Sequence, residues 1–292
     1  MILIFDLGGG FTDMLKDLVS IYNFISKYKY NFTIRNATCR PCDNPNSFRI
    51  YSIDNLINIE SFRNNEYYIE YSKIEKNIND SNTYDFFKCK ISGRLWKGNK
   101  FINKSDILKL IINCTKEYII IGGCFWYYTN LYNMNQVSDV FKTLIPNDKI
   151  LKAFNENNIN VKYNCIHYRY ESDWIPVLKR NKIPYIIPPL DELINNLPFK
   201  NKHLIYICTS NIEELYEKKL LYNKLESYDN IIYKKKNNLN YDENGFLDLL
   251  ILNNSEEFYG NNISGFTLLS SKLKKTDNFY NKIKYFDKYN TI

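Results

Sequence analysis

The sequence is poor in alanine, glycine, proline and histidine. Its 292 residues include 10 Gly, 8 Pro and 2 His, and alanine occurs only at Ala37 and Ala153. So few glycines and prolines exclude a collagen-like repeat, and 45% hydrophobic with 24% charged residues excludes wholesale disorder. We therefore expect a globular chain that buries a core.

Long apolar runs and targeting signals are also missing. No window approaches the ~18 consecutive apolar residues of a transmembrane helix. The amino terminus has no basic region followed by a hydrophobic one, and its MILIF run is typical of a first β-strand rather than of a signal peptide. These absences favour a cytoplasmic protein without an integral membrane segment.

Cysteine is present, but not in a zinc-binding pattern or a secreted disulfide framework. There are 7 Cys, an odd number. Cys39 and Cys42 form a single CxxC, and the second pair of ligands that zinc needs is missing. Pro41 and Pro45 indicate a loop there rather than a redox-active helix start. We expect structural thiols or one local disulfide, and no metal site.

The net charge is +7, from 39 Lys and Arg against 32 Asp and Glu. This charge is a weak indication of phosphate-bearing partners. The positive residues are spread from Lys16 to Lys288, and Lys234 to Lys236 is the one run of three. Because no basic stripe and no known nucleic-acid module is visible, we expect no nucleic-acid partner. The many Asn, Ile, Lys and Tyr residues have A/T-rich codons and reflect genome composition.

The length is about twice that of a typical ~150-residue domain, which favours two domains. A strand-like start, the Gly8–Gly10 turn and a helix over 11–30 begin an alternation that continues along the chain. Further strands are expected at 116–121, 164–168, 184–187, 204–208, 231–233 and 257–259, and further helices at 191–197, 212–225 and 246–252. This alternation predicts parallel sheets with helices on both faces.

A polar segment over 152–161 has no apolar period and marks the expected domain boundary. The domains would then span 1–155 and 156–292. Residues 50–98 are the least regular part of the first domain. The basic and aromatic segment 276–292 is expected to form a helix across both domains.

The string IFDLGGGFTD resembles the phosphate-binding hairpin of the actin-like ATPases. In that family the glycines join two strands, whereas the apolar spacing after Asp13 predicts a helix. A strand-to-helix turn at Gly8–Gly10 would instead present free helix N–H groups to an anion. The ATPase is kept as the less favoured alternative.

A second polar string, HYRYESDW, follows strand-like residues in the second half. If the strand continues, its period of two places His167, Arg169 and Glu171 on one side. An arginine at the carboxyl end of a parallel strand is suited to clamp a diphosphate through paired N–H bonds. The alternative is a surface ion pair between Arg169 and Glu171, with His167 as an ordinary strand residue.

HYRYESDW resembles the His-x-Arg-x-Glu segment of the protein O-fucosyltransferases, which are GT-B glycosyltransferases that use a GDP-sugar. LDLLILNNSEEFYGNNISGFT at 247–267 is similar to the late motif of that family, and LIYICTSN at 204–211 resembles its intervening strand and turn. The glycine loop at 8–13 falls where the family has its amino-terminal loop. The four segments occur in the family order.

The resemblance implies an α/β protein of GT-B architecture, with two Rossmann-like domains whose parallel sheets face each other across a cleft. The first domain would serve the acceptor and the second would bind the GDP-sugar. The implied activity is inverting transfer of a deoxyhexose, with GDP-fucose as the leading donor, to a hydroxyl of a glycan, protein or small-molecule acceptor. No Asp-x-Asp triplet occurs, so we expect a metal-independent enzyme without a cofactor.

By resemblance, Arg169 grips the diphosphate and Asp248 contacts the guanine. The residues expected to bind the donor are Gly8, Gly9, Gly10, Phe11, Thr12, His167, Arg169, Asp248, Ser264, Gly265, Phe266 and Thr267. The expected catalytic residues are Arg169, Asp13 and Glu171.

The catalytic base is the point at which this sequence departs from the family. Gly9 stands where some members carry an acidic residue. Asp13 is the substitute candidate and Asp6 the second, although Asp13 equally fits a helix cap. A non-catalytic nucleotide-sugar or glycan-binding protein of the same fold is therefore the main alternative.

Overall fold

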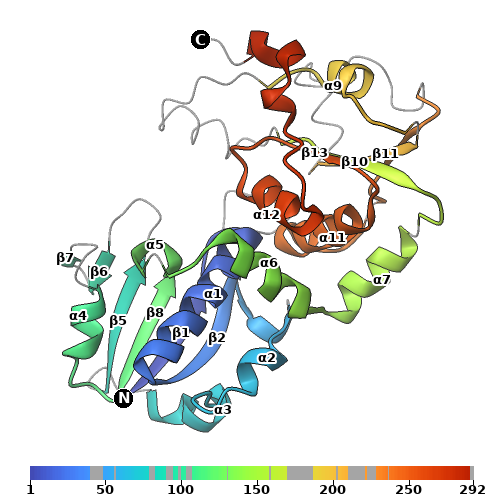
Figure 1. Cartoon of the computed structure of the whole chain (residues 1–292). Helices are drawn as coiled ribbons and strands as arrows, with labels where there is room; N and C mark the ends of the chain where they lie inside the picture. The colour runs from blue at the N-terminus through green and yellow to red at the C-terminus, as the bar shows by residue number, and fades with distance from the viewer. Residues whose placement is uncertain are drawn as a thin grey trace. The chain divides into compact units, whose positions relative to one another are not determined.

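The computed structural model describes residues 1–39, 49–55, 57–78, 83–89, 95–97, 100–102, 107–129, 131–157, 159–169, 187–201, 203–209, 221, 228–235 and 237–289. The chain divides into two units (Figure 1): unit 1 comprises Met1–Lys149 and Asn240–Glu243, and unit 2 comprises Ile150–Leu239 and Asn244–Ile292. The division falls within α7 (Asp148–Glu156). The first half of the expected polar linker is thus helical, because Ile150 and Ala153 form a buried stripe on it.

Unit 1 contains a seven-stranded sheet in the order β3-β2-β1-β8-β5-β6-β7. Its strands are β1 (Ile2–Leu7), β2 (Asn31–Cys39), β3 (Arg49–Ser52), β5 (Tyr84–Cys89), β6 (Leu95–Lys97), β7 (Lys100–Ile102) and β8 (Tyr118–Gly123). The short strands β4 (Ile57–Asn58) and β9 (Ile145–Pro146) pair separately. The helices are α1 (Phe11–Tyr28), α2 (Glu60–Arg63), α3 (Tyr71–Ile74), α4 (Ile107–Ile112), α5 (Trp126–Thr129) and α6 (Met134–Thr143), with 3-10 turns η1 (Ile53–Asn55) and η2 (Glu75–Ile78).

The centre of this sheet is parallel and its edges are antiparallel. β1 pairs in parallel with β2 and β8, and β5 pairs in parallel with β8. β3, β6 and β7 join in the antiparallel direction. The expectation of parallel pairing therefore holds for the core strands only. Short connections after β2 and β5 allow these antiparallel edges, since parallel neighbours need a longer crossover.

Helix α1 covers one face of this sheet. Leu15, Leu18 and Ile25 recur at helical spacing and are fully buried. The helix packs against β1, β2, α5 and α6 (Figure 1), and it ends at Lys29, whose left-handed backbone (φ 58°) directs its N–H to Ile25 O. Ile74 of α3 and Ile78 of η2 pack on the other face. Helical elements thus lie on both faces of the sheet, as expected.

Unit 2 contains a four-stranded sheet in the order β12-β11-β10-β13, and every neighbouring pair is parallel. Its strands are β10 (Tyr163–His167), β11 (Leu204–Cys208), β12 (Ile231–Tyr233) and β13 (Phe258–Tyr259). The helices are α9 (Leu190–Asn196), α11 (Tyr241–Asn254) and α12 (Gly265–Lys274), with 3-10 turns η5 (Tyr280–Lys282) and η6 (Lys284–Tyr289). The strand expected at 184–187 and the helix expected at 212–225 lie almost wholly outside the described residues.

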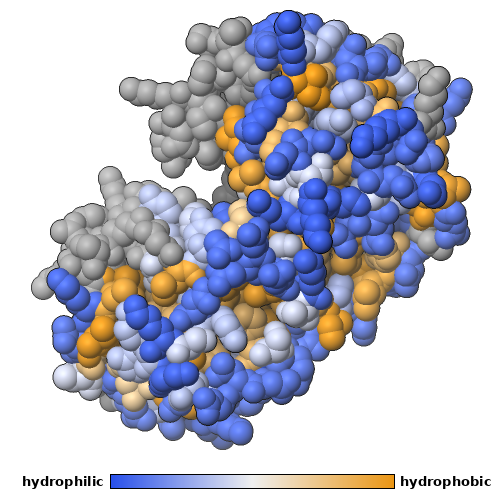
Figure 2. All heavy atoms as spheres, viewed as in Figure 1, coloured by the Kyte–Doolittle hydropathy of each residue, from blue (hydrophilic) through white to orange (hydrophobic). Residues whose placement is uncertain are grey.

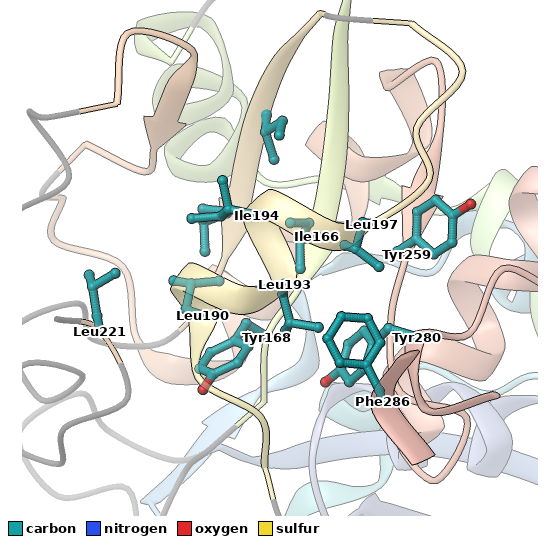
Figure 3. Close-up of a cluster of buried hydrophobic side chains, with 12 residues drawn as sticks. Ile166, Tyr168, Leu190, Leu193, Ile194, Leu197, Leu221, Tyr259, Tyr280 and Phe286 are labelled. Carbon is teal, nitrogen blue, oxygen red and sulfur yellow. The ribbon is translucent and has the colours of Figure 1, made fainter. Parts of the chain in front are cut away.

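The core on one face of this sheet contains residues from α9 and from the carboxyl-terminal segment (Figure 3). Leu190 and Leu193 of α9 pack with Ile166 of β10 and with Tyr280 and Phe286. The single helix expected at 276–292 is wrong. Tyr280 and Phe286 are buried on separate 3-10 turns within unit 2. Each turn therefore packs on the core through one buried aromatic side chain, and no continuous apolar stripe joins the two.

On the face drawn in Figure 2, hydrophilic side chains cover most of the coloured surface and hydrophobic ones appear in separate patches. Among the described residues, no helix combines the length and hydrophobicity needed to cross a bilayer.

Candidate functional site

The carboxyl ends of the parallel strands in unit 2 gather several polar residues. His167 ends β10, Thr209 follows β11, Lys234 follows β12, and a loop after β13 leads to Ser264 at the start of α12. His167 is the register partner of Cys208, the last residue of β11. Because the strands are parallel, these ends lie on one edge, which is where open α/β sheets bind ligands.

His167 is fixed by the first turn of α12. Its Nδ1 lies 2.7 Å from Thr267 Oγ1, and its ring packs on that of Phe266 with centroids 4.4 Å apart. Burial, together with the positive charge of Arg169, lowers the pKa of His167 to about 3. The imidazole is therefore neutral at pH 7, and it joins β10 to α12.

The loop before α12 holds buried polar side chains at the start of the helix. Ser264 is the N-cap residue, but no side chain caps the helix. Ser264 and Asn261 are both fully buried, and within the described part of the chain Ser264 Oγ and Asn261 Nδ2 have no hydrogen-bond partner. Buried donors are normally satisfied, so their position beside an uncapped helix N-terminus fits an anionic ligand.

Gly260 allows this loop to approach α12 closely. A Cβ at Gly260 would lie 2.5 Å from Thr267 Cγ2 and 2.8 Å from a ring carbon of Phe258. Only glycine fits without displacing them. The Gly-Asn pair of the late motif is therefore explained by packing at the glycine and by a turn at Asn261, whose Oδ1 accepts from Ile263 N at 3.0 Å.

Asp248 of α11 forms an ion pair at the same edge. Lys234 Nζ lies 2.9 Å from Asp248 Oδ2, and each side chain is only 12% exposed. The carbonyl oxygen of Asp248 is 3.9 Å from Cys208 Sγ, which places this pair next to the end of β11. The sequence reasoning noted Lys234 only as part of the one run of three lysines and gave it no role in the site.

Arg169 lies two residues beyond β10. The strand ends at His167, so the condition under which strand alternation would place Arg169 on the same side as His167 is not met. Between them, Tyr168 is fully buried: its backbone N–H donates to Cys208 O at 2.9 Å, and its side-chain OH donates to Pro188 O at 2.8 Å. Arg169 is partly exposed and close enough to affect His167. Glu171 lies outside the described residues.

In unit 1, the glycine turn connects β1 to α1. The actin-like hairpin is excluded, because Gly8–Gly10 lead into an 18-residue helix and β1 pairs in parallel with β2. A Cβ at Gly8 would lie 2.6 Å from Gly123 Cα, and Gly9 has φ +84°. Both positions need glycine for packing or backbone geometry.

Two carboxylates of the protein accept hydrogen bonds from backbone N–H groups of this turn. Asp17 is fully buried and accepts from Gly8 N at 3.3 Å and from Trp126 N at 2.8 Å, and its burial raises its pKa. Phe11 N donates to Asp242 Oδ1 at 3.1 Å. Sequence reasoning identified neither carboxylate. The turn is thus braced by protein groups on two of the N–H donors considered for phosphate.

The candidate bases in unit 1 are both paired. Asp13 is the third residue of α1, after the N-cap Gly10, and its Oδ1 lies 3.0 Å from Lys16 Nζ. Lys16 in turn lies over the Trp126 ring at 4.3 Å. Asp6 receives two hydrogen bonds from Arg35, so it is less accessible to a substrate proton than Asp13.

Two cysteine thiols lie in the buried part of the unit 2 sheet. Cys165 and Cys208 are buried and free, with sulfur atoms 3.3 Å apart on neighbouring strands. Cys39 ends β2, whereas Cys42 lies outside the described residues. In the portion of the chain that the structure describes, no three His, Cys, Asp or Glu side chains converge as metal ligands would.

The two units, each with parallel strands at the centre of its sheet, share their fold with solved fucosyltransferases of the GT-B class. The chain superposes on the NodZ α-1,6-fucosyltransferase, in a crystal soaked with GDP-fucose, with a TM-score of 0.57 and 13% identity over 93% of this chain and 92% of the other. It superposes on POFUT1 in complex with GDP-fucose with a TM-score of 0.56 and 11% identity over 94% of each chain.

A third solved structure, the fucosyltransferase NodZ from Bradyrhizobium, gives a TM-score of 0.55 and 13% identity over 92% of this chain and 90% of that one. No protein-family model and no curated protein sequence matches the chain. At these identities the likeness establishes the fold.

The buried His167 predicts a specific acid sensitivity. The folded-state pKa of about 3 lies below the ordinary 6.5, so the unfolded chain binds a proton that the folded chain does not. The stabilisation is complete above pH 6.5 and is lost as pH falls towards 3. Between pH 7 and 5.5, His167 should cost about 1 kcal/mol of stability.

Urea unfolding of wild type and His167→Asn at pH 7 and 5.5 measures this effect, because Asn keeps a polar partner for Thr267. The stability gap between the two proteins should shrink by about 1 kcal/mol at the lower pH. A gap that does not change with pH would mean that His167 is not buried in its neutral form.

Proposed function

We propose that the protein is a glycosyltransferase that moves fucose from GDP-fucose to an acceptor hydroxyl, with inversion at the anomeric carbon and without a metal ion. One observation carries the proposal. At the N-terminus of α12, Ser264 Oγ and Asn261 Nδ2 are buried and have no partner among the residues that the structure describes. The fold is shared with NodZ and POFUT1, whose solved structures include GDP-fucose complexes.

Unit 2 would bind the donor through its diphosphate. The N–H groups at Gly265 and Phe266 begin α12 and carry the positive end of the helix dipole. Ser264 Oγ adds a hydroxyl donor. Thr267 and His167 hold this turn against β10, so the donors are fixed before the ligand arrives.

Arg169 would supply the charge that the departing GDP requires. An inverting transfer develops negative charge on the leaving diphosphate, and a guanidinium forms charge-assisted bonds to it. His167 is neutral, so Arg169 meets no competing cation from that ring. Asp248, held by Lys234, would accept the N–H groups of the guanine.

Unit 1 would serve the acceptor, whose identity as a glycan, a protein or a small molecule is open. Asp13 is our candidate for the base that takes the proton of the acceptor hydroxyl, and its side chain is 24% exposed. Glu171 is the further catalytic candidate. We assign Gly8, Gly9, Gly10 and Thr12 to shaping the turn that positions Asp13.

Calorimetry with GDP, UDP and ADP tests the donor assignment, and a mass-spectrometric acceptor screen with GDP-fucose tests transfer. We expect GDP to bind at least about 10-fold more tightly than UDP or ADP, because only guanine matches Asp248. Equal affinity for the three nucleotides would refute the donor assignment. GDP binding without transfer to any acceptor class would instead favour the non-catalytic alternative, in which Asp13 serves only as the ion-pair partner of Lys16.

A further inference from the structure

The ion pair between Lys234 and Asp248 is partly withdrawn from solvent. Both side chains are 12% exposed, and the charged atoms are 2.9 Å apart. Removing two charges from water costs free energy that their attraction only partly returns, so such a pair adds little to stability compared with apolar packing. Stability alone therefore does not account for a pair held at this edge of the sheet.

The neighbouring lysine differs from Lys234 in all these respects. Lys235 is exposed; its N–H donates to Asn157 Oδ1 at 2.9 Å and its Nζ contacts Glu156 O at 2.6 Å. Lys235 thus braces the end of α7, whereas Lys234 turns to Asp248 on α11. The two residues are adjacent and carry the same charge, but only Lys234 forms the ion pair with Asp248.

The pair also lies on the edge that holds the proposed diphosphate subsite. Cys208 contacts the Asp248 carbonyl and is the register partner of His167, which contacts Thr267 of α12. Asp248 adds its negative charge to the burial that raises the pKa of Tyr206 on β11. These contacts connect the pair to His167 and α12 through β11 and β10.

The chemistry of the pair matches one nucleobase edge. Guanine presents an acceptor, O6, next to two donors, N1–H and the N2 amino group. A carboxylate accepts from the donors, and an ammonium group beside it donates to O6. Adenine presents an amino donor where guanine has O6 and an acceptor at N1, so both partners of the pair would face groups of the wrong kind.

We propose that Lys234 is a specificity residue of the donor site, donating to guanine O6 while it holds Asp248 for the N1–H and N2 donors. This inference rests on the proposed function, since it assumes a GDP-linked donor at this edge. It adds Lys234 and guanine O6 to the proposed contacts of the donor. Discrimination between guanine and adenine would then depend on the Lys234 ammonium group at O6 as well as on the Asp248 carboxylate.

Two diphosphates that differ only at position 6 test this contact: GDP and 6-thio-GDP, in which sulfur, a weak acceptor, replaces O6. Calorimetry on wild type should show about 10-fold tighter binding of GDP. In Lys234→Met, GDP affinity should fall about 10- to 100-fold and the preference over 6-thio-GDP should disappear. Lys235→Met, which removes the same charge one residue away, should keep both the affinity and the preference.

The ratio of the two ligands is measured within each variant, so it does not depend on how much of a destabilised variant is folded. Wild type that prefers GDP to ADP but not to 6-thio-GDP would overturn the role of Lys234 and leave the donor assignment intact. A preference that survives in Lys234→Met would do the same. Wild type that does not prefer GDP to ADP would overturn both.

Discussion

An Arg169→Ala variant is expected to lose fucosyl transfer by about 100- to 1000-fold, the usual cost of removing one group that stabilises developing charge. Arg169 follows the last residues of β10 and is partly exposed, so the fold should remain. The loss should appear mainly in kcat, because charge on the leaving diphosphate grows as the glycosidic bond breaks.

Two further variants make this result specific. Arg169→Lys keeps the charge but cannot form paired parallel N–H bonds, so partial activity is expected. Lys162→Ala removes a cation whose side chain is 69% exposed and pairs with Glu256, and it should have wild-type activity. Turnover by Arg169→Ala equal to that of wild type would remove Arg169 from the mechanism.

Substitution of Gly8 by alanine should destabilise unit 1 by about 3 kcal/mol. The new Cβ would lie 2.6 Å from Gly123 Cα and 2.9 Å from Gly123 C. Both are backbone atoms of β8, which is paired on both sides in the sheet, so neither can move without disturbing the strands. Urea unfolding followed by circular dichroism measures the change.

Gly10→Ala is the matched control for this substitution. Gly10 has φ −79° and ψ 172°, a conformation that any L-residue adopts. The cost should therefore stay within about 1 kcal/mol. Equal losses for the two variants would show that the glycine turn is sensitive to any side chain, and that the close contact with Gly123 is not the cause.

Local patterns predicted the elements that depend on one stretch of sequence. The apolar spacing at Leu15 and Leu18 predicted α1. The apolar run LIYIC predicted β11, which spans Leu204–Cys208. β2 was not predicted, because NFTIRNATC mixes polar and charged residues with short apolar ones. Its position between β1 and β3 stabilises it as a strand through neighbours that are far away in sequence.

The roles of Ser264 and Thr267 in the site stay predictions, but the start of α12 beside them was predictable from the sequence after the Gly-Asn turn. Contacts between distant segments were not. Asp242 and Phe11 are 231 positions apart, and the pairing of Lys234 with Asp248 depends on how β12 and α11 meet. The strand expected at 164–168 ends one residue earlier, at His167, and the Tyr168 side chain that follows donates its OH to Pro188 O.

The hydrogen bond from Phe11 to Asp242 has a consequence for synthesis of the chain. Unit 1 includes Asn240–Glu243, where Asn240 Oδ1 and the Glu243 side chain form a reciprocal cap that fixes the Asp242 turn. The N-terminus of α1 therefore lacks this partner until residue 242 has left the ribosome. Although its sheet is built from the first half of the chain, unit 1 is completed only when most of unit 2 has been translated.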